Sequence, residues 1–243
     1  MTRKYLTALP VYNEARHLDE VLPEVLRYSP DVLVVNDGST DGTADLLRRY
    51  PTIQVLAHAK NEGYGAALRD AFRFAIDHDF EILVTIDCDG QHQPSLIPEL
   101  AAAAEDADIV SGSRYLKAFD PSARPPEDRR RINRELTREL NRRLGLRLTD
   151  AFCGFKAYRV EALRKLRITE TGYAMPLQVW VQAVRCGLRI QEVAVPLIYL
   201  DEARAFGGAL DDAEYRLRHY YDVLERELAA APVGVSASRR ADE

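Results

Sequence analysis

Cysteine is scarce in this sequence of 243 residues, and its three cysteines form no recognisable pattern. Cys88, Cys153 and Cys186 are odd in number, lie far apart, and show neither CxxC nor Cys/His ligand spacing. A disulfide scaffold and a zinc-binding module are therefore excluded. We expect reduced thiols in a cytoplasmic protein.

Long apolar runs and an excess of positive charge are missing as well. No segment approaches the roughly 18 consecutive apolar residues of a membrane span. Met1–Lys4 leads into a strand-like run with no apolar stretch of signal-peptide length behind it. The net charge is −5, so there is no global positive field to attract nucleic acid. We expect no nucleic-acid partner, and any membrane contact would come from the protein surface.

The remaining composition is that of a soluble globular protein. Hydrophobic residues make up 47% of the chain and charged residues 29%, which is typical of such proteins. The length suffices for one large α/β domain with its own core. Residues from Ala229 onward are small, polar or charged. The sequence therefore predicts one domain over residues 1–228 and a disordered tail over residues 229–243.

Short apolar runs alternate with helical patterns along the chain. The clearest helical pattern follows Gly65, where apolar residues recur on one face from Leu68 to Ile76. Such alternation predicts an α/β fold with a mostly parallel, Rossmann-like sheet that helices cover on both faces. Strands are predicted at Tyr5–Leu9, Val32–Val35, Ile53–Ala57, Ile82–Ile86, Ile109–Val110 and Ile190–Val195. Further helices are predicted near Pro94, over Glu127–Leu144, after Arg159 and from Pro176 to Gly187.

Two proline-containing segments interrupt this rhythm. Pro23 lies inside the apolar series of the first helix, so a kink or a split is predicted there. Lys117–Pro126 contains three prolines and no apolar periodicity, which predicts a long, mobile loop that orders over a bound ligand. Loops of that length inside a domain are usually functional or disordered.

Polar clusters follow three of the predicted strands. They are Pro10–Glu14, Asn36–Gly42 and Asp87–Gln91. In an open α/β sheet, ligands bind beyond the carboxyl ends of the strands, so these stretches are expected to converge on one crevice. Within the second cluster we expect Asp37 to face the ligand.

Asp87, Asp89 and Gln91 are the most informative of these residues. They alternate along the sequence, so in an extended segment their side chains lie on one side. A divalent cation on a diphosphate takes one or two carboxylates and fills its other positions with phosphate and water. The motif therefore predicts a metal that, as a Lewis acid, neutralises charge on a departing nucleotide. The structural alternative is an acidic turn that caps the helix near Pro94.

Two further motifs lie beside the predicted strands. Arg114 follows Ser111–Ser113, and its planar guanidinium suits phosphate, with a surface salt bridge as the alternative. Gly63-Tyr64-Gly65 superficially resembles a dinucleotide fingerprint, but Leu68 replaces its third glycine. We interpret these glycines as a tight turn into the helix.

With these residues in hand, the chain resembles the family 2 glycosyltransferases of GT-A fold, particularly the polyprenyl-phosphate (dolichol-phosphate) mannosyl- and glucosyltransferases. The similarity runs from about Leu6 to Gly207, and its motifs occur in the family's order. Each motif is weak alone, and together they are specific. The corresponding segments are Pro10–Glu14, Val35–Thr43, Asn61–Ala67, Asp87–Pro94, Gly112–Tyr115 and Asp150–Lys156.

The resemblance implies an inverting, metal-dependent transfer of a hexose from a nucleotide-diphosphate sugar of the GDP-mannose or UDP-glucose type. The donor half would cover about residues 1–114 and the acceptor half about residues 115–228. Mg²⁺ or Mn²⁺ would be held by Asp87, Asp89 and Gln91, and Asp89 would belong to the catalytic set. Arg114 and Arg204 would contact phosphate groups near the acceptor. The nucleotide would be held by Pro10, Tyr12, Glu14, Asp37, Gly65 and Asp87.

The acceptor half departs from the family pattern, so two classes of acceptor stay open. Gln178 stands where the family often has an acidic residue, and Arg204–Gly207 lacks the Ser-Lys that often follows. Polyprenyl phosphate is already an anionic nucleophile and needs no enzymic base, whereas a soluble hydroxyl acceptor does. For a hydroxyl acceptor, Asp150 is the candidate catalytic base. Its alternative role is that of a loop carboxylate bonded to nearby backbone.

A row of arginines marks the predicted helix Glu127–Leu144. A basic amphipathic helix could lie on an anionic membrane and bring the site to a lipid phosphate, which predicts peripheral membrane contact. The alternative is a solvated face interleaved with Glu135 and Glu139. The arginines are Arg131, Arg134, Arg138 and Arg142.

Two other functional classes remain as alternatives. A haloacid-dehalogenase-like phosphatase also places a DxD after an apolar strand, with the first Asp as nucleophile. Against it, Asp87–Gly90 lies in the middle of the chain, and Gln91 stands where that family has Thr or Val. A non-catalytic nucleotide-sugar binding protein would bind nucleotide and metal without turnover.

Overall fold

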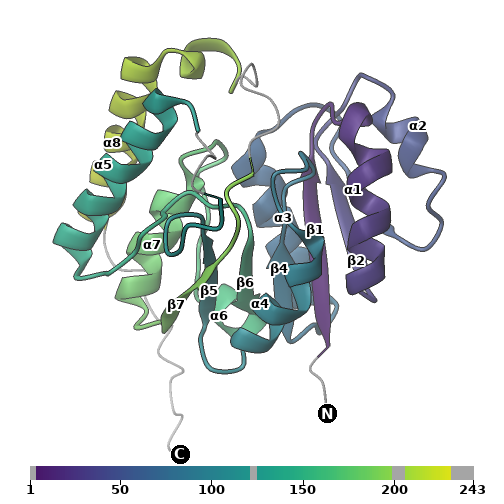
Figure 1. The fold of residues 1–243 in the computed structure, drawn as a ribbon, viewed down its shortest axis with the longest axis horizontal. Coiled ribbons are helices and arrows are strands. Elements are labelled where there is room, and N and C mark those ends of the chain that lie inside the picture. Colours follow the sequence, from purple (N-terminus) through teal and green to yellow (C-terminus); the bar gives the residue numbers. More distant parts are fainter. Residues whose placement is uncertain (1–3, 121–124, 199–205, 231–243) are drawn as a thin grey trace, which may run out of the picture.

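A computed structural model describes residues 4–120, 125–198 and 206–230 of the chain. In these ranges seven strands form one sheet in the order β3-β2-β1-β4-β6-β5-β7 (Figure 1). The six strands predicted from sequence are all present, with ends shifted by a few residues. The strands are β1 (Tyr5–Val11), β2 (Val32–Asn36), β3 (Gln54–Ala57), β4 (Ile82–Thr85), β5 (Ile109–Ser113), β6 (Lys156–Arg159) and β7 (Ile190–Ala194).

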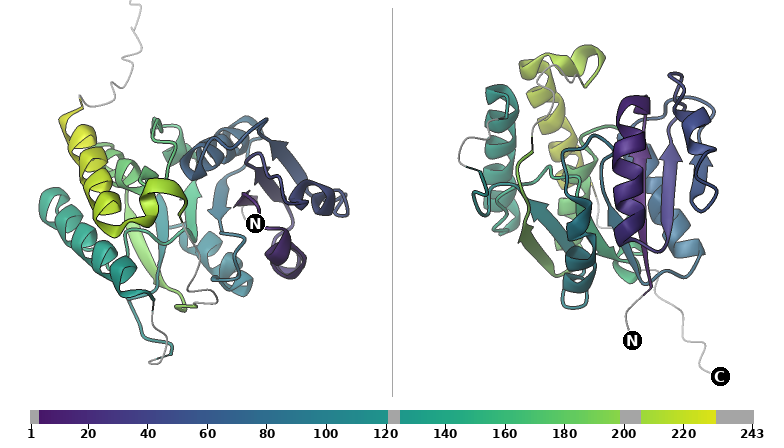
Figure 2. Two further views of the ribbon diagram at one scale, coloured as in Figure 1. Left: turned by 90° about the horizontal axis from the view of Figure 1, so that it is seen from above. Right: turned by 45° about the vertical axis from the view of Figure 1, so that its right-hand side comes forward.

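Helices cover both faces of the sheet, as predicted (Figures 1 and 2). On one face lie α1, α2 and α4, and on the other lie α3, α6 and α7, with α5 and α8 packed outside them. The helices are α1 (Ala15–Tyr28), α2 (Thr43–Leu47), α3 (Tyr64–Asp77), α4 (Ile97–Ala103), α5 (Glu127–Leu144), α6 (Val160–Leu163), α7 (Met175–Arg185) and α8 (Ala213–Ala229), with 3-10 turns η1 (Pro94–Leu96) and η2 (Gly208–Asp211).

Successive side chains of a strand point to opposite faces of the sheet, so the core has two parts, one on each face. In β2, Leu33 and Val35 join the cluster under α3 and α7, whereas Val32 and Val34 join the cluster under α1 and α4. All four side chains are at most 2% exposed. A strand buried on both faces carries a continuous apolar run, which is why the sequence marked it so clearly.

The sheet is mostly parallel, and β6 is its exception. β1 pairs in parallel with β2 and β4, and β5 pairs in parallel with β7. β6 runs antiparallel between β4 and β5. The sequence did not predict β6, because its four residues, Lys-Ala-Tyr-Arg, form no apolar run. Because β6 runs antiparallel, the segment just before it lies at the carboxyl ends of the parallel strands.

Two helices differ from the sequence prediction in their extent. Pro23 lies inside α1 and does not split it, because α1 is anchored on the sheet by Leu18, Val21, Leu22 and Val25. α8 was not predicted, and it extends to Ala229, the first residue of the predicted tail. Residues 231–243 of that tail lie outside the described ranges, as do residues 121–124 of the predicted loop Lys117–Pro126.

Buried polar side chains fasten α8 to the rest of the domain. Glu227, 9% exposed, accepts hydrogen bonds from Gln178 (2.7 Å) and Gln182 (2.8 Å) of α7. Arg216, 2% exposed, contacts Asp128 of α5 and donates to the Leu210 carbonyl at 2.6 Å. Gln178, where the family pattern often has an acid, therefore serves to hold α8. No helix within the described ranges has the length and apolar content needed to cross a membrane.

Candidate active site

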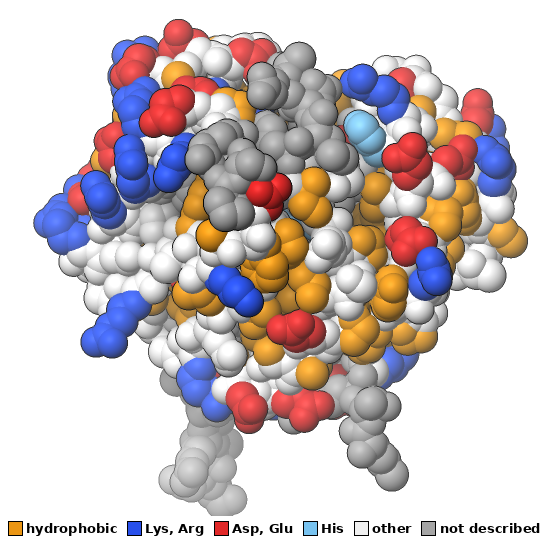
Figure 3. All heavy atoms as spheres, in the orientation of Figure 1, with side chains coloured by type: hydrophobic (Ala, Val, Ile, Leu, Met, Phe, Trp, Pro, Cys, Tyr) orange, Lys and Arg blue, Asp and Glu red, His pale blue; other side chains and the backbone are white. Residues whose placement is uncertain are grey.

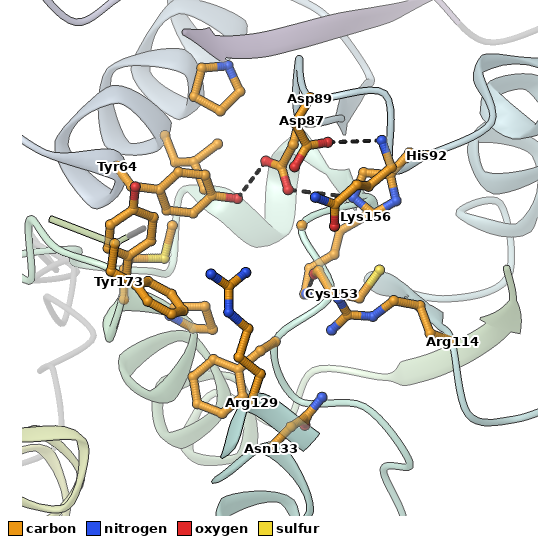
Figure 4. Close-up of a pocket in the computed structure, with 18 of the residues that line it drawn as sticks. Tyr64, Asp87, Asp89, His92, Arg114, Arg129, Asn133, Cys153, Lys156 and Tyr173 are labelled. Atoms are coloured by element: carbon orange, nitrogen blue, oxygen red, sulfur yellow. Dashed lines mark hydrogen bonds and ion pairs between the residues drawn. The ribbon is translucent and has the colours of Figure 1, made fainter. Parts of the chain in front are cut away.

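A cavity of about 220 Å³ opens at the carboxyl ends of the central strands, where the sequence predicted a crevice. The end of β1, the loops after β4 and β5, and the loop before β6 contribute to one side of it. Side chains of α3, α5, α7 and α8 close the other side. Figure 4 shows the carboxylates of Asp87 and Asp89 facing Arg129 across this cavity.

Asp87, Asp89 and Gln91 lie together in the cavity wall, as their alternation predicted. Gly90 between the acids has a φ of +74°, and the Gln91 amide donates to Asp89 Oδ1 at 3.0 Å. Asp87 Oδ1 accepts from the Tyr64 hydroxyl at 3.0 Å, and its Oδ2 lies 3.4 Å from His92 Nε2. The turn therefore presents carboxylate and amide oxygens to one space instead of capping η1, which has no side-chain cap.

This donor set fits a divalent cation that shares its ligands with a diphosphate. Carboxylate and amide oxygens are the ligands that Mg²⁺ and Mn²⁺ take, and Mg²⁺ uses few protein ligands when phosphate supplies the rest. Among the described residues there is no group of three or more His, Cys, Asp or Glu side chains that could hold a metal alone. His92 Nδ1 is buried and has no hydrogen-bond partner among the described residues, a feature that native proteins rarely retain without a role.

The loop before β6 and the first residue of β6 bring two features to the metal motif, and the sequence analysis assigned no role to either. Gly154 lies so close to Asp87 that a Cβ atom there would overlap the carboxylate. Lys156, 3% exposed, lines the cavity, contacts the Cys153 carbonyl and lies 5.4 Å from the centre of the Trp180 ring. Burial lowers the pKa of Lys156, although nearby Cys153 and Asp150 oppose the shift. A cation thus lies in the same wall as the two acids.

Arg114 reaches the cavity, and Asp150 holds it there. Arg114 Nε and Nη2 donate to the two oxygens of Asp150 at 2.6 and 2.9 Å. Asp150 is fully buried and also accepts from Asn133 Nδ2 at 2.7 Å. Burial alone would raise the pKa of Asp150, but the charge and hydrogen bonds of Arg114 hold it at about 2. A carboxylate so weakly basic, with both oxygens occupied, is a poor general base, which favours the structural alternative for Asp150.

The cavity wall opposite the acids is cationic and aromatic, and the sequence did not reveal it. Arg129 of α5 points into the cavity, 4.7 Å from the centre of the Phe206 ring (Figure 4). Aromatic and apolar side chains from α3, α5, α7 and α8, and from the segments before β6 and before α7, also line the cavity. They include Leu68, Ile132, Phe152, Tyr173, Met175, Val179 and Tyr220. A guanidinium beside an apolar wall suits a ligand with an anionic head and an apolar body.

Some predicted nucleotide-binding residues lie outside this cavity. Pro10 lines it, whereas Tyr12 (46% exposed), Glu14 and Asp37 lie at the ends of β1 and β2 beyond the cavity lining. Asp37 does not present a free carboxylate, because it accepts from the Glu62 and Gly63 amides at 2.7 and 2.8 Å and contacts His58.

Gly65 and Arg204 complete the predicted set. A side chain at Gly65 would overlap the Glu170 carbonyl, so this glycine permits α3 to approach the loop before α7. This packing accounts for the glycine, and its contact with nucleotide stays a prediction. Arg204 lies outside the described residues.

Comparison with known proteins assigns this chain to a family. The model of the family described as Glycosyl transferase family 2 matches residues 7–167, which include the metal motif and β6. The chain belongs to glycosyl transferase family 2. This assignment confirms the predicted hexosyltransferase and removes the phosphatase alternative.

Relatives of this family 2 chain agree with one another. It is 34% identical over 221 residues to undecaprenyl-phosphate mannosyltransferase of Micrococcus luteus, with 86% of this chain and 90% of the relative covered. It is 30% identical over 205 residues to polyprenol monophosphomannose synthase of Mycolicibacterium smegmatis, with 80% and 77% covered.

Solved structures confirm the GT-A fold. The structure of glucosyl-3-phosphoglycerate synthase from Mycobacterium tuberculosis with Mn²⁺, UDP and glucosyl-3-phosphoglycerate matches with a TM-score of 0.71. The match has 20% identity and covers 96% of this chain and 82% of that chain. At this identity the similarity shows the fold alone.

Proposed function

We propose that this family 2 enzyme transfers mannose, with inversion, from a nucleoside-diphosphate mannose to the phosphate of a polyprenyl phosphate. The observation that best supports this proposal is that one cavity has both an acidic wall and a cationic, aromatic wall. The names of the two bacterial relatives, which are mannosyltransferases of polyprenyl carriers, support this choice of sugar and acceptor. The mechanism follows from what each wall can bind.

Asp87, Asp89 and Gln91 would hold Mg²⁺ or Mn²⁺ together with the donor diphosphate. The bound metal would supply Lewis-acid stabilisation of the charge that develops on the departing nucleoside diphosphate. Tyr64 donates to Asp87 and keeps one oxygen of that carboxylate in place. Gly154 leaves the room that the carboxylate occupies. The chain thus contributes orientation around a metal whose remaining ligands come from substrate.

Two arginines of the cavity lining would bind the acceptor phosphate. Arg129 points into the cavity, and Arg114 Nη1 has no hydrogen-bond partner among the described residues. Guanidinium groups bind phosphate through paired N–H donors and retain their charge at all relevant pH values. The apolar side chains of the cavity lining would receive the first carbons of the lipid chain. A phosphate oxygen so placed attacks the anomeric carbon as an anion.

A phosphate acceptor also agrees with the state of Asp150, the candidate base for a hydroxyl acceptor. A hydroxyl nucleophile requires a group that accepts its proton, and Asp150 is unsuited because its pKa is about 2 and Arg114 occupies it. A phosphate nucleophile makes no such demand. The state of Asp150 therefore favours polyprenyl phosphate over a soluble alcohol.

The test is a matched pair of acceptors. After a thermal-shift panel of GDP- and UDP-sugars with and without Mn²⁺ has identified the donor, the enzyme is given undecaprenyl phosphate or undecaprenol. We expect a metal-dependent mannolipid from the phosphate only, and NMR of the product should show an inverted anomeric configuration. Transfer to undecaprenol or to soluble alcohols at a rate similar to that with undecaprenyl phosphate would contradict the phosphate-acceptor proposal. The absence of stabilisation by any nucleotide sugar would contradict the donor assignment.

A further inference from the structure

Tyr64, the residue between Gly63 and Gly65, contacts the predicted metal motif through its side chain. It is the first residue of α3, and its hydroxyl donates to Asp87 Oδ1 at 3.0 Å. An ionised carboxylate can only accept, so the direction of this hydrogen bond is fixed.

The backbone beneath Tyr64 is held from two sides. Gly63 has a φ of +105°, and its amide donates to Asp37. The Gly65 amide donates to the Thr171 carbonyl at 2.8 Å, and side chains at either glycine would overlap backbone of the 170–172 segment. The start of α3 therefore has little freedom to move. Because the backbone at Tyr64 is rigid, its side chain can hold Asp87 in a defined orientation.

The ring of Tyr64 is held by a column of aromatic side chains that crosses the cavity. It stacks on Tyr173, with ring centres 5.5 Å apart and planes at 17°. Tyr173 meets the edge of Phe206 at 5.2 Å. The guanidinium groups of Arg129 and Arg216 lie 4.7 and 4.4 Å from the centre of the Phe206 ring. Figure 4 shows Tyr64 and Tyr173 side by side, with the Tyr64 hydroxyl turned to Asp87.

These contacts are continuous from a metal ligand to the acceptor wall. Stacked and edge-on aromatic pairs add to simple burial and prefer defined geometries. The second polar contact of Asp87, with His92, is longer at 3.4 Å. The Tyr64 hydroxyl thus lies closer to the Asp87 carboxylate than His92 does. Tyr64 also connects Asp87 with the cationic wall.

We propose that Tyr64 is a positioning residue that orients Asp87 for the metal, and that the stack of Tyr173 and Phe206 keeps Tyr64 in place. The proposal rests on the metal-dependent donor site proposed above. Partners that hydrogen-bond to a metal ligand typically contribute a factor of about 10–100 in metal affinity. Tyr64→Phe removes the hydroxyl and keeps the ring and its stacking.

The primary measurement is nucleoside-diphosphate binding by calorimetry as Mn²⁺ is varied. We expect Tyr64→Phe to require about 10–100-fold more Mn²⁺ for the same nucleotide affinity. Binding without metal and thermal unfolding without ligand should match those of the wild type. In turnover, saturating Mn²⁺ should restore most of kcat, because the variant is impaired in holding the metal and not in chemistry. A purely structural hydroxyl would produce no such dependence on metal.

Tyr50→Phe is the matched control, because it removes a hydroxyl that donates to Asp19 at 2.9 Å on the exposed surface. It should leave the Mn²⁺ dependence unchanged. Tyr173→Leu removes the stacked ring but keeps the Tyr64 hydroxyl, and it should also raise the Mn²⁺ requirement.

The outcomes separate the two proposals. If the wild type binds nucleotide with Mn²⁺ and Tyr64→Phe has the same Mn²⁺ dependence, the role of Tyr64 is overturned and the donor site stands. If Tyr173→Leu leaves the Mn²⁺ requirement unchanged while Tyr64→Phe raises it, the proposed role of Tyr173 and Phe206 in holding Tyr64 is overturned. If the wild type shows no metal-dependent nucleotide binding, the proposed function fails first.

Discussion

Replacing Asp150 with Asn distinguishes a catalytic from a structural carboxylate. The substitution keeps the shape of the side chain but leaves Arg114, whose side chain is only 19% exposed, without its ionic partner. Removing one member of a buried ion pair typically destabilises a protein by about 3–5 kcal/mol. We therefore expect a loss of that size in the free energy of unfolding at pH 7. A general base, in contrast, would affect turnover and leave stability almost unchanged.

Part of this loss should depend on pH. The pKa of Asp150 falls from 3.8 to about 2 in the folded protein, which corresponds to about 2 kcal/mol of stability. Because the folded-state pKa is the lower one, this contribution is complete above pH 3.8 and is lost as pH falls toward 2. The difference between wild type and Asp150→Asn should therefore be constant from pH 7 to about 5. Below pH 4 it should narrow by about 2 kcal/mol.

Urea unfolding followed by tryptophan fluorescence measures this difference. Trp180 is the single tryptophan, is fully buried, and donates to the Ala151 carbonyl beside Asp150. Asp45→Asn, in an exposed pair with Arg48, is the control and should not change stability measurably. An Asp150→Asn enzyme as stable as the wild type but inactive would refute this reasoning. It would return Asp150 to the catalytic groups and soluble alcohols to the candidate acceptors.

Three further predictions concern the metal and the membrane. Asp89→Asn should abolish metal-dependent nucleotide binding in calorimetry with little loss of stability, since a carboxylate that serves a metal adds nothing to the core. Gly154→Ala should displace the Asp87 carboxylate and raise the Mn²⁺ concentration needed for nucleotide binding. Arg134→Gln with Arg138→Gln should weaken sedimentation with anionic vesicles by about 1 kcal/mol per arginine at low salt, with less effect at high salt.

Each of these variants has a control. Gly145→Ala places a side chain at a φ of +68° where it meets no neighbour, so it should lower stability without altering the Mn²⁺ dependence. Arg27→Gln with Arg48→Gln changes the net charge equally on α1 and after α2 and should leave vesicle binding intact. Unchanged nucleotide affinity in Asp89→Asn would remove the metal assignment. Wild-type protein that never binds vesicles at low salt would remove the membrane prediction.

The arginine row on α5 illustrates what a local pattern can predict. The helix forms over the predicted residues Glu127–Leu144, and Arg134 and Arg138 have no ion-pair partner among the described residues. Arg131 and Arg142, however, pair with Glu214 and Glu139. Figure 3 shows basic and acidic side chains interspersed over this edge of the molecule. The spacing predicted the helix, but the charge available to a membrane depends on partners that spacing does not show.

The candidate site divides in the same way. Asp87, Asp89 and Gln91 were predictable because one short turn after one buried strand carries all three. Arg129, Phe206 and Tyr64 come from elements distant in sequence, and only the packing of α3, α5 and the segment before η2 brings them together. The contact that favours a structural role for Asp150 is its ion pair with Arg114, which also joins residues distant in sequence.

The position of β6 also affects how the chain can fold during its synthesis. β4 is fully buried, and its antiparallel partner is Lys156–Arg159, which leaves the ribosome only after the whole of α5. Until then one edge of β4 exposes unpaired backbone beside apolar side chains, a ready template for aggregation. The nascent chain must therefore either wait with that edge shielded or fold late and as one cooperative unit. Fragments divided near residue 114 should not be expressible as separate folded halves, even though the metal motif lies wholly in the first.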